Sequence, residues 1–284
     1  MAITSDWHIH SHNSLDGACM RIADLIAGAR AKGVQDFGVT DHLNTPCNLP
    51  DIEASRSEYL ENDPGPRFHF GIEVSCVSQW ELDEIASGRH GFQDWGLRSG
   101  GPPGAEPAIG LTEEDIAACG IEYVVGGVHW PLYVPMERDA VIRDYHRQNM
   151  FLARHPLVDI VAHPWWWMGG WADDNDRYPG DPWLDDFGKV PQSMHDEFAA
   201  AAIEHGAVVE CNIGACLLNE SYPGSFARQY LEYLAGLKQR GVKLCAGSDC
   251  HSEHYTTNLE KAARMLESAG ITDADFWRLP PRTE

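Results

Sequence analysis

The residues best suited to chemistry lie near the N-terminus, in the stretch Trp7-His8-Ile9-His10-Ser11-His12-Asn13-Ser14-Leu15-Asp16-Gly17. His8 and His10 are two positions apart, so on a strand their side chains point to the same side. A strand over Ile3 to His8 therefore predicts two imidazoles that converge on one point, with Asp16 returning from the loop beyond. Two histidines and a carboxylate in this arrangement indicate a metal site.

The same design recurs along the chain, because other buried-looking strands also end in His, Glu or Asp. Such strands are expected at 34–40, 68–74, 123–128, 158–162, 207–212 and 242–247. The polar residues at or just beyond the strand ends comprise six histidines and three carboxylates: His8, His10, Asp16, His42, Glu73, His129, His163, Asp249 and His251.

The elements that position these residues are strands that alternate with helices. Amphipathic stretches predict helices at 19–32, 52–60, 137–154, 192–205, 225–240 and 258–270, and Thr112 with three following acids predicts the start of a shorter one. Alternation of this kind is typical of a parallel α/β fold. Seven strand–helix units predict a seven-stranded (β/α)7 TIM-like barrel, and we interpret 1–284 as a single domain. In such a barrel the carboxyl ends of the strands surround one mouth, where active sites lie.

Two segments depart from this alternation. Residues 80–107 contain the run Gly100-Gly101-Pro102-Pro103-Gly104 and are interpreted as an excursion from the core. Residues 165–188 form a Trp-, Gly- and Asp-rich loop over the mouth. Its Trp165, Trp166 and Trp167, with Trp130 and Trp171 nearby, either form an aromatic wall for a substrate ring or pack beneath the loop as core.

Composition narrows the function classes. The net charge of −22 argues against nucleic acid or an anionic membrane as partner and leaves a small-molecule substrate. Eight scattered cysteines without a Cys-x-x-Cys pair indicate reduced thiols rather than a disulfide framework. The chain has neither a signal-peptide pattern nor an apolar run long enough to span a membrane, so we expect a cytoplasmic protein.

One histidine at a strand end is more often a hydrogen-bonded structural residue than a ligand. Six histidines and three acids buried together without metal would each need a partner of their own, which makes the set costly. Nine such side chains exceed the coordination of any single ion, so we expect two or three divalent ions, with Glu73 as a bridge. Mixed nitrogen and oxygen ligands favour zinc, iron or manganese over magnesium or calcium.

The set resembles the PHP (polymerase and histidinol phosphatase) domain family of metal-dependent phosphoesterases. The resemblance rests on His8-x-His10 with Asp16-Gly17, Thr40-Asp41-His42, Gly71-Ile72-Glu73, Gly127-Val128-His129, Ala162-His163-Pro164 and Gly247-Ser248-Asp249-x-His251. It implies a distorted seven-stranded barrel and a trinuclear centre. By analogy one ion is held by His8, His10, Glu73 and Asp249, a second by Glu73, His129 and His163, and a third by Asp16, His42 and His251.

The resemblance implies hydrolysis of a small phosphomonoester by a hydroxide that bridges two ions. Glu73 and Asp249 are then the central catalytic carboxylates. His12 and His254 are candidates for proton transfer to the leaving oxygen, and Asp41 and Asn212 for orienting the ligands. Trp130, Trp165, Trp166, Arg154 and Arg177 are the candidates for substrate binding.

The chain departs from histidinol phosphatase after the sixth strand, where members of that type carry a basic residue. Here the sequence reads Asn212-Ile213-Gly214-Ala215-Cys216, so histidinol phosphate itself is not implied. The scarcity of basic residues also motivates a second hypothesis, an amidohydrolase-like or lactone-cleaving enzyme that uses the same metal cluster. A regulatory or metal-storage module is a third interpretation.

Overall fold

Seven parallel strands form the centre of the molecule. The structure is a computed structural model, and it describes residues 2–62, 65–168 and 181–282. The strands pair in the order β1-β2-β3-β6-β7-β8-β9, so each lies beside its neighbour in the chain. Their bounds are β1 Ser5–Asp6, β2 Asp36–Leu43, β3 Phe68–Ser75, β6 Tyr123–Gly127, β7 Ile160–Val161, β8 Val208–Asn212 and β9 Lys243–Gly247.

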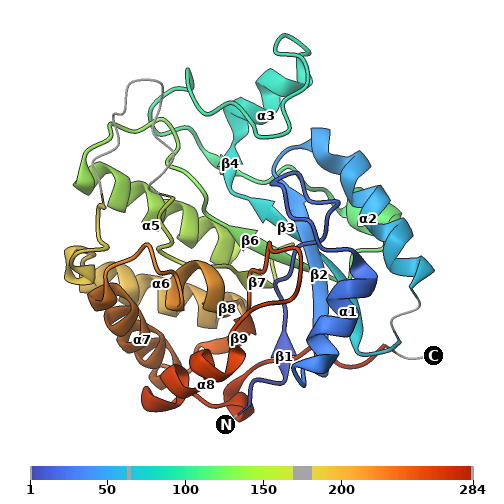
Figure 1. The fold of residues 1–284 in the computed structure, drawn as a ribbon. Coiled ribbons are helices and arrows are strands. Elements are labelled where there is room, and N and C mark those ends of the chain that lie inside the picture. The colour runs from blue at the N-terminus through green and yellow to red at the C-terminus, as the bar shows by residue number, and fades with distance from the viewer. Residues whose placement is uncertain (1, 63–64, 169–180, 283–284) are drawn as a thin grey trace.

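Helices connect successive strands and surround them on the outside (Figure 1). Helix α4 (Glu113–Cys119) begins at a capping box: the Thr112 hydroxyl accepts from the Asp115 amide at 3.1 Å, and the Asp115 carboxylate accepts from Thr112 N at 3.0 Å. The connecting helices are α1 Ile22–Ala31, α2 Leu49–Glu61, α4 Glu113–Cys119, α5 Arg138–Arg154, α6 Gln192–His205 and α7 Gly224–Gln239, and α8 Leu259–Ser268 follows β9. This arrangement confirms the predicted (β/α)7 barrel.

The barrel is closed by the first and last strands. Trp7 N donates to Ala246 O at 3.0 Å, Asp249 N donates to His8 O at 2.7 Å, and Ile9 forms a parallel bridge with Cys250. The strand predicted over Ile3 to His8 is shorter in the structure, because the regular β2 ladder stops after Asp6. Beyond Asp6, Thr40 N of β2 still donates to Ile9 O at 2.8 Å. His8 and His10 still flank that bridge at the carboxyl end.

Residues 80–107 form an insert whose two ends meet. Strand β4 (Val77–Ser78) pairs antiparallel with β5 (Pro107–Ala108), so the chain returns to the point from which it departs. The insert is more regular than expected, since it begins with helix α3 (Gln79–Ala86), capped by the Ser78 hydroxyl. Helix α3 projects from the body of the molecule at the top of Figure 1.

Large side chains fill the amino end of the barrel. Tyr123 donates its hydroxyl to Trp7 O at 3.1 Å, and its ring packs against the edge of the Trp7 indole. Gly38 and Gly71 make room for that ring, because a Cβ at either position would collide with it. Packed side chains therefore fill the barrel at the amino ends of the strands, and the polar groups lie at the carboxyl ends.

Every helix in the described part of the chain is too short or too polar to span a lipid bilayer.

Candidate metal centre

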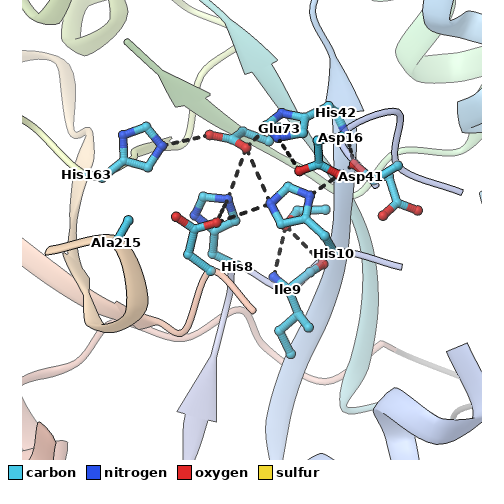
Figure 2. A network of polar contacts seen from close by, with 12 residues as sticks. His8, Ile9, His10, Asp16, Asp41, His42, Glu73, His163 and Ala215 are labelled. Carbon is cyan, nitrogen blue, oxygen red and sulfur yellow. Dashed lines mark hydrogen bonds and ion pairs between the residues drawn. The ribbon is translucent and has the colours of Figure 1, made fainter. Parts of the chain in front are cut away.

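Nine polar side chains meet at the carboxyl end of the barrel. Figure 2 labels His8, His10, Asp16, His42, Glu73 and His163 among them. β2 and β3 carry two of the nine, and the segments that follow β1, β6, β7 and β9 carry the rest. Because parallel strands end at one rim, residues distant in sequence become neighbours. They are the predicted ligands His8, His10, Asp16, His42, Glu73, His129, His163, Asp249 and His251.

Glu73 lies at the middle of the cluster and is fully buried. Its Oε2 lies 3.1 Å from His8 Nε2 and 3.0 Å from His42 Nδ1. Its Oε1 lies 3.2 Å from His129 Nε2 and 3.0 Å from His163 Nε2. His10 Nε2 also lies 3.5 Å from Oε2. One carboxylate thus faces five imidazoles with its two oxygens, a geometry that suits a bridging ligand.

Asp249 and Asp16 flank this centre on separate sides. Asp249 Oδ1 lies 3.5 Å from His8 Nε2 and 3.4 Å from His10 Nε2. Asp16 Oδ2 lies 3.2 Å from His42 Nε2 and also contacts His251. The two acids therefore extend the cluster beyond Glu73 in two directions.

The potential ligand atoms form three overlapping groups. One contains His10, Asp16, His42 and His251, a second His8, His10 and Asp249, and a third His42, Glu73 and His129. Each group could hold one ion. They overlap with the division implied by the resemblance but differ from it in four respects. His10 also joins Asp16, His42 and His251, and Glu73 is absent from the group of His8, His10 and Asp249. His42 also joins Glu73 and His129, and His163 lies against Glu73 without belonging to any of the three groups.

Several buried atoms in the cluster lack a hydrogen-bond partner. They include the two ring nitrogens His8 Nε2 and His10 Nε2, together with His42 Nδ1 and Glu73 Oε2. They contact one another only as ion pairs, with Glu73 Oε2 at 3.1 Å from His8 Nε2 and 3.0 Å from His42 Nδ1. Unpaired polar atoms in a protein interior carry a large desolvation cost. A cation shared between their lone pairs removes that cost, so the donor set fits divalent metal.

Outer hydrogen bonds turn the ring nitrogens toward the cluster. His8 Nδ1 lies 2.8 Å from Glu210 Oε1, His129 Nδ1 lies 2.8 Å from Ser75 Oγ, and His251 Nδ1 lies 2.9 Å from the Asp249 carbonyl. An Nδ1–H donated outward leaves the Nε2 lone pair free to point inward. Three of the imidazoles are therefore oriented so that Nε2 could bind a cation.

Glu210, on β8, has a role that the sequence analysis missed. Its side chain is fully buried, receives the His8 ring, and accepts from the His163 amide at 2.7 Å. Asn212 links Glu210 to Asp249, because its Nδ2 lies within 3.1 Å of both carboxylates. This contact agrees with the orienting role predicted for Asn212. The sequence feature that could have identified Glu210 is its position as a single acid inside the apolar run Val208-Val209-Glu210-Cys211.

Asp41 supports the cluster indirectly. Its carboxylate accepts hydrogen bonds from the Ser11 amide and hydroxyl, both at 2.6 Å, and from the Ser55 hydroxyl. These bonds fix the loop between His10 and Asp16 against β2 and α2. Asp41 therefore positions backbone that carries ligands rather than an imidazole itself.

The protonation of the cluster follows from burial and neighbouring charge. Burial lowers the pKa of His10 to about 3 and that of His129 to about 4. Burial also opposes the charged form of His42, but the carboxylates of Glu73 and Asp16 outweigh it and raise the pKa of His42 to about 10. The adjacent imidazoles hold the pKa of Glu73 well below its usual range, against the effect of burial. Glu73 is thus a carboxylate at neutral pH.

Strained backbone accompanies the site. His163, Trp165 and Asp249 have φ angles of 28°, 70° and 54°, in the left-handed region that side chains rarely adopt. Such conformations cost free energy and cluster at functional sites.

A cavity of about 370 Å³ opens onto the cluster. Seven of the nine candidate ligands line it, whereas His8 and His10 lie deeper. Large apolar side chains form much of its wall, among them Trp95, Trp130, Trp166 and Met168, and Asn44 also lines it. The described lining residues include no lysine or arginine. The cavity therefore combines an anionic and imidazole floor with apolar walls.

Trp130 and Trp166 occupy the wall as predicted, whereas Trp165 does not line the cavity. Its side chain is 1% exposed and packs against Trp183, Phe187 and His195. The left-handed backbone at Trp165 directs consecutive tryptophans to different sides, so Trp165 belongs to the core under the loop. Trp95, from the insert, was not predicted; the Arg98 guanidinium lies 5.1 Å from its ring centre and 4.5 Å from that of Trp130.

The other predicted substrate and proton-transfer residues lie away from the cavity lining. Arg154 ends α5, which runs back toward the amino ends of the strands, and it borders a separate pocket with Asp159 and Val208. His12 pairs with Glu58 at 2.7 Å on the surface, and His254 is exposed. Arg177 and Trp171 lie outside the described residues.

The fold and the cluster define a β/α-barrel protein with a candidate metal centre at the carboxyl ends of its strands. The model of the PHP domain family matches residues 6–159, more than half of the chain. The chain therefore belongs to the PHP domain family.

Similar proteins align over nearly the whole chain at low identity. A probable phosphatase from Enterobacter sp. (strain 638) is 22% identical over 283 residues, covering 98% of this chain and 90% of that protein. A probable phosphatase from Shewanella frigidimarina (strain NCIMB 400) is 24% identical, covering 95% and 87%. Among solved structures, a chain in the cryo-EM structure of archaeal ribonuclease P with mature tRNA aligns at 12% identity and a TM-score of 0.43, covering 95% of this chain and 84% of that one.

Proposed function

We propose that this protein is a metal-dependent phosphatase that hydrolyses a small phosphomonoester whose leaving group carries an apolar ring. The observation that carries the proposal is the buried convergence of six imidazoles and three carboxylates, several with unpaired lone pairs, on the floor of a cavity. Family membership and relatives named probable phosphatases support it.

The cluster fits two or three divalent ions of the zinc, manganese or iron type. We assign one ion to His8, His10, Asp249 and Glu73, a second to Glu73, His129 and His163, and a third to Asp16, His42 and His251. When bound, such ions supply an activated water and neutralise charge on the phosphoryl oxygens. Glu73 would be shared between two of these ions, because its two oxygens face the imidazoles of different groups.

The chain's own residues orient and enclose the substrate. Glu210 and Ser75 orient His8 and His129 through their Nδ1 atoms. Trp95, Trp130 and Trp166 offer aromatic surface near the cluster, which favours a planar leaving group and excludes water around the reacting bond. A small polar leaving group would leave this apolar surface uncovered.

The proposal is tested with a panel of aryl and alkyl phosphomonoesters, each assayed with Mn²⁺ or Zn²⁺ and again after chelation. We expect aryl phosphates to be hydrolysed fastest and the activity to disappear with the metal. A preparation that retains its metal ions but hydrolyses none of the esters would contradict the proposal.

The absence of lysine and arginine among the described lining residues favours a second candidate, a hydrolase of amides or lactones. The same cluster could activate water for attack on a carbonyl, and the apolar walls would hold an uncharged substrate. Turnover of lactones or N-acyl compounds, without inhibition by orthophosphate, would select this alternative.

A further inference from the structure

Asn44 presents an unused hydrogen-bond donor at the cavity. It follows His42 by two residues, lines the cavity, and is 1% exposed. Its Nδ2 is buried and has no hydrogen-bond partner in the structure. A buried N–H without an acceptor costs free energy. A bound ligand that supplied an acceptor would remove this cost.

A relay of hydrogen bonds determines which end of the Asn44 amide is unused. Ser75 Oγ lies 2.8 Å from His129 Nδ1 and 2.5 Å from Asn44 Oδ1. When His129 binds metal through Nε2, its proton is on Nδ1 and is donated to Ser75 Oγ. The Ser75 hydroxyl must then donate to Asn44 Oδ1. The Asn44 NH2 group is thereby left without a partner.

The backbone around Asn44 is held rigidly. The amides of Asn44 and Thr45 donate to Asn48 Oδ1 at 3.1 and 3.2 Å, and the Thr45 hydroxyl donates to Gln93 O at 2.8 Å. The last bond ties this segment to the insert that carries Trp95. A donor fixed in this way needs little reorganisation when it meets its acceptor.

We propose that Asn44 is a substrate-binding residue whose Nδ2 donates a hydrogen bond to a phosphoryl oxygen of the bound ester. This inference rests on the phosphatase function proposed above. Asn44 is joined through a single hydroxyl to His129, beside Glu73, so its donor belongs to the part of the cavity where the cluster would hold the phosphoryl group. A neutral amide thus supplies a contact in a cavity whose described lining has no basic side chain.

The test compares Asn44→Ala and Asn44→Asp with the wild-type protein, all loaded with Mn²⁺. Manganese content, the affinity for orthophosphate and kcat/KM for an aryl phosphate are measured. We expect both variants to keep their manganese while orthophosphate affinity and kcat/KM fall about 10- to 100-fold, as for the loss of one hydrogen bond to a charged group. Asn44→Asp is expected to fall further, because a carboxylate repels the phosphoryl oxygens. Asn62→Ala, at the end of α2, is the control.

Each outcome decides between the models. Variants that bind orthophosphate as tightly as the wild type would overturn the inference and leave the phosphatase proposal standing. Loss of manganese together with orthophosphate affinity would also overturn it, because Asn44 would then act only by orienting His129. A manganese-loaded wild type that neither binds orthophosphate nor hydrolyses any phosphomonoester would refute the phosphatase proposal and this inference with it. Asn44→Asp, which conserves side-chain shape, covers the case in which the alanine variant fails to fold.

Discussion

A buried carboxylate that faces five imidazoles makes Glu73 the most sensitive residue of the site. Glu73→Gln keeps the shape but replaces one oxygen with an NH2 group that cannot bind a cation. We expect metal affinity to fall by more than the roughly 10- to 100-fold typical of losing an outer contact, and phosphatase activity to fall with it. Elemental analysis and turnover measure this, with the exposed Glu204→Gln as control. A Glu73→Gln protein with full metal content and activity would contradict the bridging role.

Substitution of Glu210 shows whether the orientation of a metal ligand affects metal affinity, because Glu210 holds the His8 ring without being a candidate ligand itself. Its Oε1 receives His8 Nδ1 at 2.8 Å, which raises the basicity of Nε2 and holds the ring. Glu210→Gln keeps a hydrogen-bonding group but removes the charge, so we expect metal affinity to fall about 10- to 100-fold while the fold is retained. A chelator competition titration measures the change, again against Glu204→Gln. An unchanged affinity would show that the contact is only structural.

His42 gives the metal site a pH dependence of known sign. Nearby carboxylates raise its pKa to about 10, so the metal-free protein holds this proton at neutral pH. The proton stabilises the metal-free fold fully below the unfolded pKa of 6.5, and this contribution is lost as pH rises toward 10. A cation must displace it, so apparent affinity should increase with pH between about 6 and 9, with proton release. Calorimetry in buffers of different ionisation enthalpy detects that release, and its absence would argue against His42 as ligand.

At the scale of elements, the sequence predicted the strands whose two faces are both buried. Runs such as Val208–Cys211 and Tyr123–Val125 predicted strands, and the polar residues at their ends predicted the cluster. Helix α3 was missed because Gln79–Ala86 is only 8 residues long, too short to show a clear helical period, and its start depends on the Ser78 cap. Trp165 was misplaced because adjacency in sequence does not reveal a left-handed backbone angle. Glu210 was missed because the groups that it contacts are distant in sequence and become neighbours only in the folded structure.

The insert depends on Glu81, a fully buried carboxylate on α3. Glu81 accepts from Leu97 N and from the Tyr133 hydroxyl, and burial raises its pKa. Glu81→Ala leaves the Leu97 amide without its acceptor, at a cost of about 1–3 kcal/mol, whereas the Tyr133 hydroxyl keeps Leu97 O as acceptor. We expect the insert to become less ordered and Trp95 to leave its position in the cavity wall. The KM for an aryl phosphate should then rise severalfold. Metal content and turnover of a small alkyl phosphate should stay unchanged, as in the control Asp83→Ala on the same helix. An unaltered aryl KM would refute a role for the insert in the pocket.

At the scale of the whole molecule, bound cations would join the two ends of the chain. The candidate ligands come from segments next to β1, β2, β3, β6, β7 and β9, and His8 and Asp249 lie across the β1–β9 closure. Each strand of that closure is short, and β1 pairs with β2 over only Ser5 and Asp6. Ions that bind His8 and Asp249 together would therefore add a link between the first and last strands of the barrel. They would also offset part of the net charge of −22, which otherwise opposes compaction.

Removal of metal should consequently destabilise the whole fold. A ligand present at a thousand times its Kd stabilises the native state by about 4 kcal/mol, which for a chain of this size is roughly 10 °C in Tm. We expect chelation to lower the Tm of the wild type by about that amount, and replenished Mn²⁺ or Zn²⁺ to restore it. Glu73→Gln, with its centre disrupted, should melt at the same temperature with and without chelator. If chelation removes the metal from the wild type but leaves its Tm unchanged, the cluster binds ions without stabilising the closed barrel.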